Sequence, residues 1–314
     1  MTSEFDNKLN VLVNHAWDQE IGSPQIDAWI KNFNGGFISS DEEERYCLFM
    51  LSRFMYFGKR LVREMLKSLF RDHFQNPMRQ RIRRNNGNTR DSALIDQMYA
   101  QELATTRFIS IGNPSESGAH LLYYFRQVNH LSKDLFHDIS SAFTSIADRS
   151  GVIRSIPREP TVSRYIFFDD LVGSGDQASS YLAKELKKIR DGTKNLDIRF
   201  MSLFAATDGL KRLNSPMLFD GNATCLFELD GTFKAFEANS RYFSSPPDWF
   251  DMQTARGIAH HYGEKLFGDS LGYRDGQLLL GFSHNTPDNT LPIFWKEDGA
   301  YPWSPIFIRF DKVY

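Results

Sequence analysis

Two adjacent acids, Asp169 and Asp170, precede a Gly-Ser-Gly turn at residues 173–175. The apolar run at 165–168 before the acids predicts a β-strand, and apolar residues recur at helical spacing over 181–189. Glycines let backbone N–H groups approach phosphate oxygens, and the N-terminus of a helix adds partial positive charge. Carboxylates accept hydrogen bonds from ribose hydroxyls. The succession of strand, acidic pair, glycine loop and helix therefore suits a sugar phosphate.

Other phosphate motifs require residues that this segment lacks. A Walker loop needs a lysine after its final glycine, where this chain has Asp176. A dinucleotide fingerprint needs a third glycine after Gly175, and none follows at that spacing. An aspartyl-phosphate enzyme of the haloacid dehalogenase type needs an acid two positions after Asp169, where Leu171 stands. A purely structural alternative, in which the acids only cap the turn, stays open.

The motif FFDDLVGSGDQ at 167–177 resembles the phosphoribosyl pyrophosphate loop of type I phosphoribosyltransferases. Together with TPDNTLPIFW at 286–295, it is most similar to the phosphoribosyltransferase-like PRTase-CE family of bacterial conflict and antiviral systems. The resemblance extends over residues 100–310. It implies a type I phosphoribosyltransferase fold that acts on a phosphoribosyl or nucleotide substrate with Mg²⁺.

The resemblance implies a division of roles along this motif. Asp169 and Asp170 would hold the ribose hydroxyls, directly or through Mg²⁺, and would favour the cationic transition state. The 5′-phosphate would be surrounded by the loop and the first helical residues, Gly173, Ser174, Gly175, Asp176 and Gln177. Gly173 stands where many members have a small hydroxyl residue, and Asp176 adds a negative charge unless it caps the helix. These departures weaken the expectation of a transfer reaction more than the expectation of a sugar-phosphate ligand.

An earlier segment repeats the order of strand, small-residue loop and helix. The run at 107–111 predicts a strand and 119–131 predicts a helix. The loop between them contains small residues at four positions, Gly112, Ser115, Ser117 and Gly118. In the resembled family the equivalent loop holds the pyrophosphate leaving group, whereas an ordinary strand-to-helix connection would have the same composition.

A basic, proline-containing segment at 149–160 leads into the central strand. In phosphoribosyltransferases a loop before that strand closes over the reacting centre and supplies cations. The resemblance therefore makes Arg154 and Arg158 candidates for the catalytic site. An exposed connector would give the same composition.

The alternation of strands and helices predicts an α/β fold with a parallel sheet flanked by helices. Further strands are expected at 197–206, 224–229, 233–238 and 277–282, and further helices at 133–150 and 250–267. Before this core, helices at 9–20 and 26–33 precede one long helix that carries apolar residues from Tyr46 to Leu69, with Ser40 and Glu43 as its capping pair. We expect a helical addition at 1–95 and a phosphoribosyltransferase-like domain at 96–314.

Arginines are concentrated between residues 71 and 90, next to an Asn-Asn-Gly-Asn sequence. Clustered guanidinium groups pair well with phosphate, so Arg79, Arg81, Arg83 and Arg84 are candidates for a nucleic-acid contact. Aromatic residues do not alternate with these arginines, which weakens the case for single-strand binding. A solvated connector is the favoured interpretation.

Composition limits the remaining classes. A chain of 314 residues with a formal charge of −2 can bury a substantial core and has no global basic field for nucleic acid. The cysteines, Cys47 and Cys225, lie in apolar runs, which argues against disulfides and cysteine-based zinc sites. His260 and Glu264 share a helix face but lack a third ligand at metal-site spacing. With a polar N-terminus and no membrane-spanning run, the expected location is the cytoplasm.

Two functional hypotheses follow from these observations. The first is a Mg²⁺-dependent phosphoribosyltransferase-type enzyme, acting as an effector in bacterial antiphage defence and contacting a partner protein through its N-terminal helices. The second is a catalytically silent nucleotide sensor or complex subunit that keeps the phosphate site. The acceptor base, the partner and the oligomeric state are not indicated by one sequence.

Overall fold

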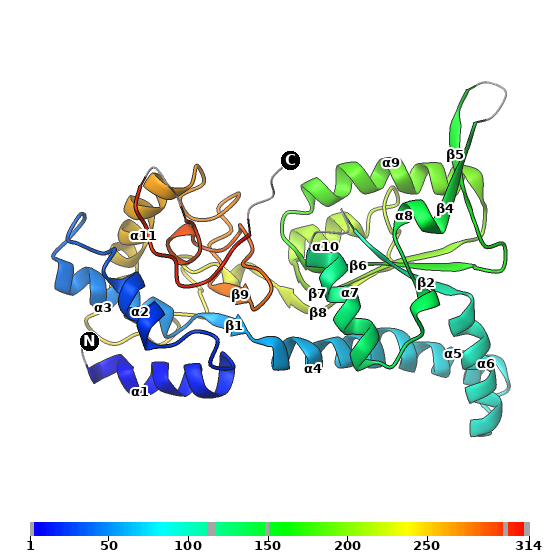
Figure 1. Ribbon diagram of the computed structural model, residues 1–314, viewed down its shortest axis with the longest axis horizontal. Helices are drawn as coiled ribbons and strands as arrows, with labels where there is room; N and C mark the ends of the chain where they lie inside the picture. Colours follow the sequence, from blue (N-terminus) through cyan, green and yellow to red (C-terminus); the bar gives the residue numbers. More distant parts are fainter. Residues whose placement is uncertain (1–2, 112–116, 148–150, 298–300, 311–314) are drawn as a thin grey trace. The chain divides into compact units, whose positions relative to one another are not determined.

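The structure, a computed structural model, describes residues 3–111, 117–147, 151–297 and 301–310 (Figure 1). The chain forms two units. Unit 1 comprises Met1–Val62 and Leu229–Tyr314, and unit 2 comprises Arg63–Glu228. Within the described residues, no helix is both long and apolar enough to cross a membrane.

Unit 2 is built on a five-stranded sheet with the order β3-β2-β6-β7-β8. Its strands in chain order are β2 (Thr106–Ser110), β3 (Phe136–His137), β6 (Arg164–Val172), β7 (Asp197–Ala206) and β8 (Ala223–Leu229). β6 pairs in parallel with β2 on one side and with β7 on the other, and β2 pairs in parallel with β3. The expected α/β fold with a parallel sheet is confirmed.

The strand order reverses direction between β2 and β6. From β2 the chain moves outward to β3, whereas from β6 it moves the opposite way to β7 and then β8. In open parallel sheets, ligands bind beyond the carboxyl ends of the strands at such a reversal. The two strands lie side by side there, because the Ile111 N–H donates to the Phe168 carbonyl at 3.3 Å.

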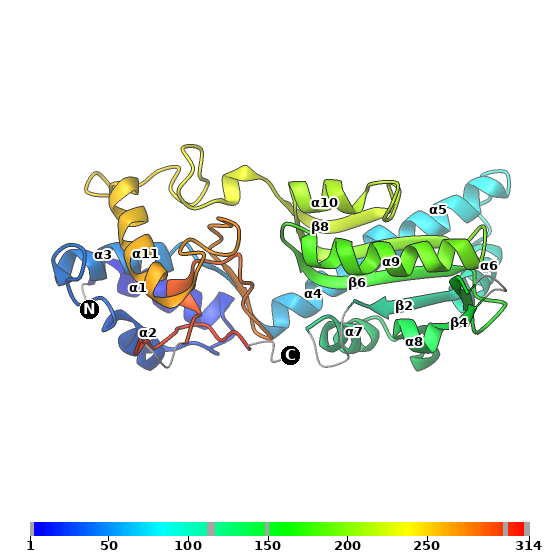
Figure 2. The same ribbon diagram turned by 90° about the horizontal axis from the view of Figure 1, so that it is seen from above.

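Helices cover both faces of this sheet (Figures 1 and 2). Side chains alternate along a strand, so Phe167 and Phe168 point to opposite faces. Phe167 belongs to the hydrophobic cluster that contains Leu182 and Leu186 of α9 (Asp176–Gly192). Phe168 contacts Phe125 of α7 (Ser117–Val128), with ring centroids 4.9 Å apart. Both faces of β6 are therefore buried, and each fully buried large apolar side chain contributes about 1.5–3 kcal/mol.

Residues 71–90 are mostly helical, contrary to the expected solvated connector. A π-helical turn η2 (Arg71–Gln75) continues α4 (Lys59–Phe70) into α5 (Asn76–Asn85), and α6 (Ser92–Ala104) follows. Met78 and Ile82 of α5 are buried. Arg79 and Arg81 pair with Asp96 and Glu102 of α6. The arginines were misinterpreted because their acidic partners lie on the next helix.

The helix expected at 133–150 is also wrong. This stretch contains a short turn η3 (Lys133–Leu135), β3, a four-residue helix α8 (Ile139–Ala142) and β4 (Phe143–Ala147). β4 pairs antiparallel with β5 (Ile153–Pro157). Apolar residues follow the helical period here, but aromatic and β-branched residues such as Phe143 and Thr144 favour the hairpin.

Unit 1 joins the two ends of the chain in one aromatic core. Its helices are α1 (Ser3–Val11), η1 (Leu12–Ala16), α2 (Ser23–Ile30), α3 (Ser40–Leu51) and α11 (Met252–Leu266), and its strands β1 (Met55–Phe57) and β9 (Leu280–Phe282) pair in parallel. Trp29 stacks on Phe294 at 5.2 Å, and Phe33 contacts Trp303 at the same distance. This division differs from the expected boundary between residues 95 and 96, because C-terminal aromatic residues pack on the N-terminal helices.

The C-terminal segment supplies core and connections. The indole N–H of Trp295 donates to the Thr290 carbonyl at 2.7 Å, and that of Trp303 donates to the Ile293 carbonyl at 3.1 Å. Both tryptophans are buried. The expected strand at 233–238 is wrong, because the chain there forms the short turn η4 (Gly231–Phe233) and irregular structure. A second short turn, η5 (Pro292–Phe294), lies in the same aromatic core.

The single long helix expected up to Leu69 is interrupted. α3 ends at Leu51, and the chain then forms β1 before α4 begins at Lys59. A Cβ atom at Gly58 would overlap the side chain of Asp18, which accepts a hydrogen bond from the Arg60 N–H at 2.9 Å. The continuous apolar pattern therefore spans three elements, because pairing of β1 with β9 overrides helical propensity.

Glu43 does not form the expected capping pair with Ser40. The N-cap of α3 is Ser39, and the buried Glu43 carboxylate accepts hydrogen bonds from the loop before it. Its donors are Gly35 N–H at 2.8 Å, Phe37 N–H at 2.7 Å, Ile38 N–H at 3.1 Å and the Tyr262 hydroxyl at 2.6 Å. Glu43 thus connects α3, the preceding loop and α11.

We expect Glu43→Gln to lower the free energy of unfolding at pH 7 by about 1–3 kcal/mol, because its amide would point a donor at groups that already donate. Burial alone would raise the pKa of Glu43, but the hydrogen bonds from Tyr262 and the loop lower it overall. Stability from a lowered pKa is present above the unfolded-state value of about 4.3 and is lost as the pH falls through the folded-state value.

Urea unfolding between pH 7 and pH 3 measures this effect. The difference between the wild type and Glu43→Gln should shrink as the pH falls, whereas Glu264→Gln, at an exposed position of α11, should change stability little at any pH. A difference for Glu43→Gln that stayed constant down to pH 3 would contradict the interpretation.

Candidate functional site

The acidic pair lies inside β6, not at its end. The strand continues past Asp169 and Asp170 to Val172, so it is longer than the sequence predicted. Because successive side chains of a strand point to opposite faces, the two carboxylates leave the sheet on opposite sides. By this alternation Asp169 falls on the side of Phe167, which packs with α9, and Asp170 on the side of Phe168, which packs against α7; at the end of the strand Val172 again belongs to the α9 cluster.

The two acids also differ in exposure. Asp170 is 9% exposed, whereas Asp169 is half-buried. The Asp170 N–H donates to Oδ1 of Asp169 at 2.9 Å, and the Leu171 N–H donates to Oδ1 of Asp170 at 2.7 Å. Each carboxylate is thus oriented by the backbone that follows it, and Asp169 is the more accessible of the two.

The loop at 173–175 depends on two glycines. Gly175 is the N-cap of α9 and has a φ of +73°, a left-handed conformation that side chains rarely adopt. A Cβ atom at Gly209 would overlap the carbonyl oxygen of Gly173. Gly209 lies in α10 (Thr207–Leu213), the helix that follows β7. The loop therefore lies directly against the backbone of the neighbouring helix.

This arrangement directs backbone donors beyond the sheet. The first N–H groups of a helix have no acceptor within it, and together they carry a partial positive charge. Ser179 completes the first turn of α9, since both its N–H and its hydroxyl donate to the Gly175 carbonyl. Asp176 and Gln177 begin α9, and the structure describes their backbone only. Ser174 is half-buried in the loop.

The early small-residue loop follows β2, the strand next to β6. Gly112 and Ser115 lie outside the described residues, and Ser117 and Gly118 begin α7 with only their backbone described. The hydrogen bond from Ile111 to Phe168 places the start of this loop beside the acids. The two loops therefore leave adjacent strands at the same edge of the sheet.

The two candidate arginines lie elsewhere in unit 2. Arg154 is on β5, and Arg158 follows it, with Nε donating to the carbonyls of Ser140 and Phe143 at 3.2 Å. β5 packs against the far end of α9, where a Cβ atom at Gly192 would overlap the Ser155 carbonyl. At about 1.5 Å per residue, α9 separates its two ends by about 24 Å. The structure does not bring the arginines together with Asp169 and Asp170.

The donor types at this edge suit a hard cation. Among the described residues, no three His, Cys, Asp or Glu side chains form a metal cluster. Mg²⁺ commonly binds through one or two carboxylates together with waters and substrate phosphates. Asp169 supplies such a carboxylate, whereas Asp170, the second predicted ligand, leaves the strand on the other side. His260, which was considered with Glu264 as a metal ligand, lies in unit 1, where its Nδ1 is 2.6 Å from the Ser270 hydroxyl.

Sequence reasoning missed the role of Gly209. Gly209 lies in the first turn of α10, which begins at Thr207 directly after β7. Its position after the strand next to β6 was the available signal, because loops at the carboxyl edge of a parallel sheet lie close together. The contact with Gly173 depends on tertiary structure.

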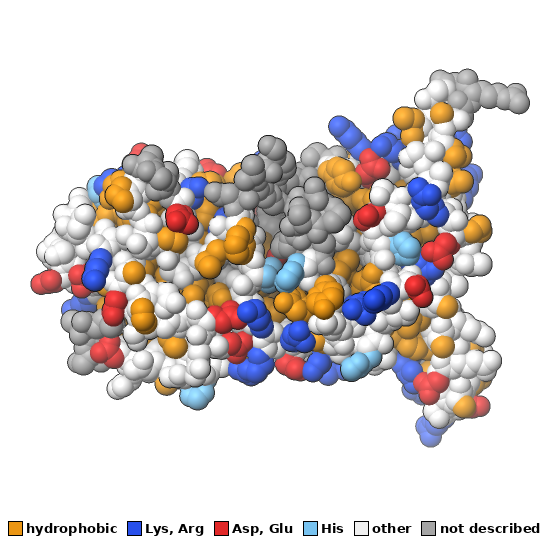
Figure 3. Space-filling view, in the orientation of Figure 1, with side chains coloured by type: hydrophobic (Ala, Val, Ile, Leu, Met, Phe, Trp, Pro, Cys, Tyr) orange, Lys and Arg blue, Asp and Glu red, His pale blue; other side chains and the backbone are white. Residues whose placement is uncertain are grey.

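Charge on the face shown in Figure 3 gives little support to a broad nucleic-acid interface there. On the face shown in Figure 3, basic and acidic side chains are interspersed. Arg79 and Arg81 are engaged by acids of α6, and Arg83 and Arg84 are exposed on α5.

Comparisons with known proteins give the following matches. No curated protein matches the chain. Among solved structures, the xanthine-guanine-hypoxanthine phosphoribosyltransferase of Helicobacter pylori aligns with a TM-score of 0.27 and 13% identity, over 49% of this chain and 76% of that one. A protein of Aquifex aeolicus aligns with a TM-score of 0.27 and 14% identity, over 67% and 84%. The adenine phosphoribosyltransferase of Trypanosoma brucei aligns with a TM-score of 0.24 and 11% identity, over 46% and 68%.

A family model covers far more of the chain than these alignments do. It matches residues 26–309, so it includes most of both units together with the acidic pair and its glycine loop. The resemblance that the motifs indicated is thereby confirmed at the level of the family: this chain belongs to the PRTase-CE family.

Proposed function

We propose that this protein is a Mg²⁺-dependent enzyme of the phosphoribosyltransferase type that acts on a phosphoribosyl or nucleotide substrate. The observation that carries the proposal is the connection from β6 to α9. It combines an accessible acid, Asp169, a left-handed N-cap glycine, Gly175, and a long helix that starts at the carboxyl edge of the sheet. The site lies beside the reversal of strand order, where ligands of such sheets bind.

The 5′-phosphate would bind at the first turn of α9. Backbone N–H groups of Asp176 and Gln177 and the hydroxyl of Ser174 are the proposed donors, joined by the backbone of Gly173 and Gly175. A phosphate at a helix N-terminus gains from both hydrogen bonds and the helix dipole. The contact between Gly173 and Gly209 supports this role, because it fixes the loop before any ligand binds.

The ribose hydroxyls would face Asp169. This carboxylate is half-buried on the α9 side of the sheet, whereas Asp170 is 9% exposed on the other side. We therefore assign Asp169 the direct contact with ribose, and Asp170 a contribution through charge and through its hydrogen bond to Leu171. If Mg²⁺ binds here, Asp169 would hold it together with waters and substrate oxygens, and Asp170, on the other side of the strand, would contribute only through charge; the ion would offset the charge of the pyrophosphate group.

Transfer would break the bond between the anomeric carbon and the pyrophosphate oxygen and form a bond from that carbon to the acceptor. The ring becomes more positive in the transition state, and the nearby carboxylates stabilise that charge. The early loop, with Gly112, Ser115, Ser117 and Gly118, would receive the pyrophosphate. Arg154 and Arg158 would have to move with their hairpin to reach it, so we assign them no step.

The biological setting that we propose is antiphage defence, with a partner protein bound through the N-terminal helices. Membership in the PRTase-CE family supports this setting. The reaction itself does not depend on it, so it can be tested with purified protein.

A second function, a nucleotide sensor without transfer activity, has specific support. One acid of the pair is nearly buried, and the two arginines that would supply cations lie toward the other end of α9. A site of this kind would bind ribose phosphates through α9 and Asp169 without turnover. Measurements of binding and turnover on the same variants separate the two functions.

We expect Asp169→Asn to reduce pyrophosphate release from phosphoribosyl pyrophosphate by about 100-fold or more, as for the loss of one preorganised transition-state contact. Asp170→Asn should have a smaller effect, because its carboxylate is nearly buried. Asp191→Asn, on the exposed end of α9, is a control with the same charge change. Pyrophosphate release would be followed with Mg²⁺ and a panel of nucleobases, and thermal unfolding would verify the fold.

Two outcomes would distinguish the transferase from the sensor or exclude both at this site. Ribose 5-phosphate binding without turnover in the wild type would favour the sensor. If Asp169→Asn altered neither binding nor turnover, both hypotheses would be wrong about this site.

We expect Gly209→Ala to weaken binding of ribose 5-phosphate by about tenfold or more, equivalent to about 1.4 kcal/mol. The added Cβ would overlap the Gly173 carbonyl and displace the phosphate loop. The same overlap should lower stability by about 1–3 kcal/mol. Isothermal titration calorimetry and thermal unfolding measure the two effects.

Gly231→Ala is the matched control, since no heavy atom lies within 4 Å of a Cβ at that position. It should leave affinity unchanged. Equal affinities of Gly209→Ala and wild type would place the phosphate away from this loop.

A further inference from the structure

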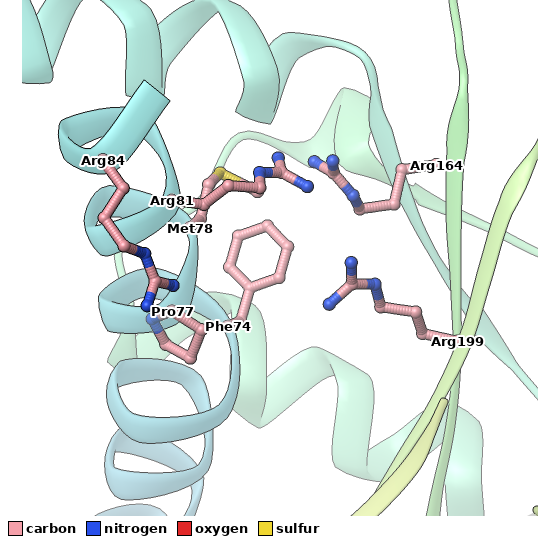
Figure 4. A pocket seen from close by; sticks show the side chains of 7 residues that line it. All are labelled: Phe74, Pro77, Met78, Arg81, Arg84, Arg164 and Arg199. Atoms are coloured by element: carbon pink, nitrogen blue, oxygen red, sulfur yellow. The ribbon is translucent and has the colours of Figure 1, made fainter. Parts of the chain in front are cut away.

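A pocket lies in unit 2 at the amino end of β6, whereas the acidic pair lies toward the carboxyl end of the same strand. It has a volume of about 170 Å³, and four arginines line it above an apolar floor that includes Phe74 (Figure 4). The arginines are Arg81, Arg84, Arg164 and Arg199. At about 3.3 Å per residue, β6 separates Arg164 from Asp169 by about 17 Å and from Val172, before the glycine loop, by about 26 Å. This pocket is therefore distinct from the proposed sugar-phosphate site.

The fold places these arginines together from separate elements. Arg81 and Arg84 are three residues apart on α5 and lie on neighbouring positions of its surface. Arg164 is the first residue of β6. Arg199 of β7 lies opposite Ile166 of β6, which is two residues from Arg164, so both arginines leave the sheet on the same face. Figure 4 shows Arg81, Arg164 and Arg199 converging around Phe74, with Arg84 next to Pro77.

Two carboxylates engage three of the guanidinium groups. Nε of Arg164 lies 2.6 Å from Asp197 and its NH2 group lies 2.9 Å from Glu102. Glu102 also pairs with Arg81 at 2.8 Å, and Asp197 pairs with Arg199 at 2.7 Å. Burial opposes ionisation of Asp197, but hydrogen bonds from Arg199 and Arg164 lower its pKa overall. Each acid therefore pairs with Arg164 and with one further arginine.

Charge in the pocket is consequently unbalanced. Among the described residues, four guanidinium groups line it and two carboxylates pair with them, which leaves two positive charges. The side chain of Arg164 is only 7% exposed. Arg81 and Arg199 are each 36% exposed and Arg84 is exposed, so an anion can reach these guanidinium groups from solvent. An ion-pair network with a purely structural role would have no need of this excess.

We propose that this pocket binds a phosphate group, supplied by inorganic phosphate or by a small phosphorylated molecule. Guanidinium groups form forked hydrogen bonds with phosphate oxygens, and a phosphate monoester carries a charge of about −1.5 to −2 at neutral pH, which matches the excess. Pockets for drug-sized ligands measure about 300–1,000 Å³, so a cavity of 170 Å³ accepts a single phosphate group better than a whole nucleotide. This site does not depend on the transfer reaction.

The test compares two neighbouring arginines of α5. Arg84→Gln removes a lining residue, while Arg83→Gln removes the same charge from an exposed position that does not line the pocket. Hydrogen–deuterium exchange with inorganic phosphate, at an ionic strength held constant with chloride, locates binding by the protection of α5. Titration followed by this protection gives the affinity at this site separately from the loop at 173–175.

Phosphate should protect residues 76–85, and Arg84→Gln should weaken that effect by about tenfold or more, because a charged hydrogen bond to phosphate is lost. Arg83→Gln should change it by less than about twofold, as expected for an exposed charge. Arg84→Gln combined with Arg199→Gln should abolish protection. Thermal unfolding of each variant would verify the fold.

Ribose 5-phosphate and two oligonucleotides identify the source of the phosphate. Ribose 5-phosphate should protect α5, and ribose should not. If oligothymidine with a 5′-hydroxyl protected α5 as well as the 5′-phosphorylated form, the region would contact a nucleic-acid backbone and the proposal would be overturned. Equal effects of Arg84→Gln and Arg83→Gln, or no protection of α5 by phosphate, would also overturn it.

Discussion

Pairing of β6 with a parallel strand on each side is the constraint on which unit 2 depends. This pairing fixes the register of Arg164 against Asp197 at one end and brings Ile111 next to Phe168 toward the other. Apolar side chains bury both faces of the strand between these ends. A central strand that is held in this way can carry charged residues near its ends, because the pairing of its core fixes where they lie. Both proposed ligand sites follow from this arrangement.

Features that depend on neighbouring residues could be predicted from the sequence, whereas features that depend on contacts between residues distant in the sequence could not. The segment from 165 to 190 was predicted because its strand, glycine loop and helix are each specified by neighbouring residues, and the structure confirms all three elements. The hairpin of β4 and β5 was missed because its apolar residues also satisfy the helical period, and its cross-strand pairing, together with residues such as Phe143 and Thr144 that favour strands, outweighs that period. The arginine pocket was missed for a related reason: its four members come from three elements that are distant in sequence.

The composition of unit 1 was not predicted either, because it also depends on contacts between residues distant in the sequence. Trp29 and Phe294 stack at 5.2 Å although more than 260 residues separate them, and the Trp29 indole donates to the Ile293 carbonyl at 2.7 Å. Composition indicated a helical N-terminal region, but its apolar surface needs a partner, and no sequence pattern identifies that partner. The motif at 286–295, which contributed to the family resemblance, supplies part of it. Its Trp295 is buried in the core of unit 1, so the motif has a structural role in the fold.

The alternation of side chains along β6 has a further consequence for the acidic pair. If the strand ended before Asp169, both carboxylates could turn toward one ligand, as the resemblance implies. Pairing of Leu171 and Val172 with β7 extends the strand beyond them, so a ligand at the proposed site on the first turn of α9 would meet Asp169 and not Asp170. Two contacts on one ribose would require the end of β6 to separate from β7. The free energy of that separation would oppose the binding of any ligand that used both carboxylates, so the length of β6 favours a site in which one carboxylate of the pair makes the direct contact.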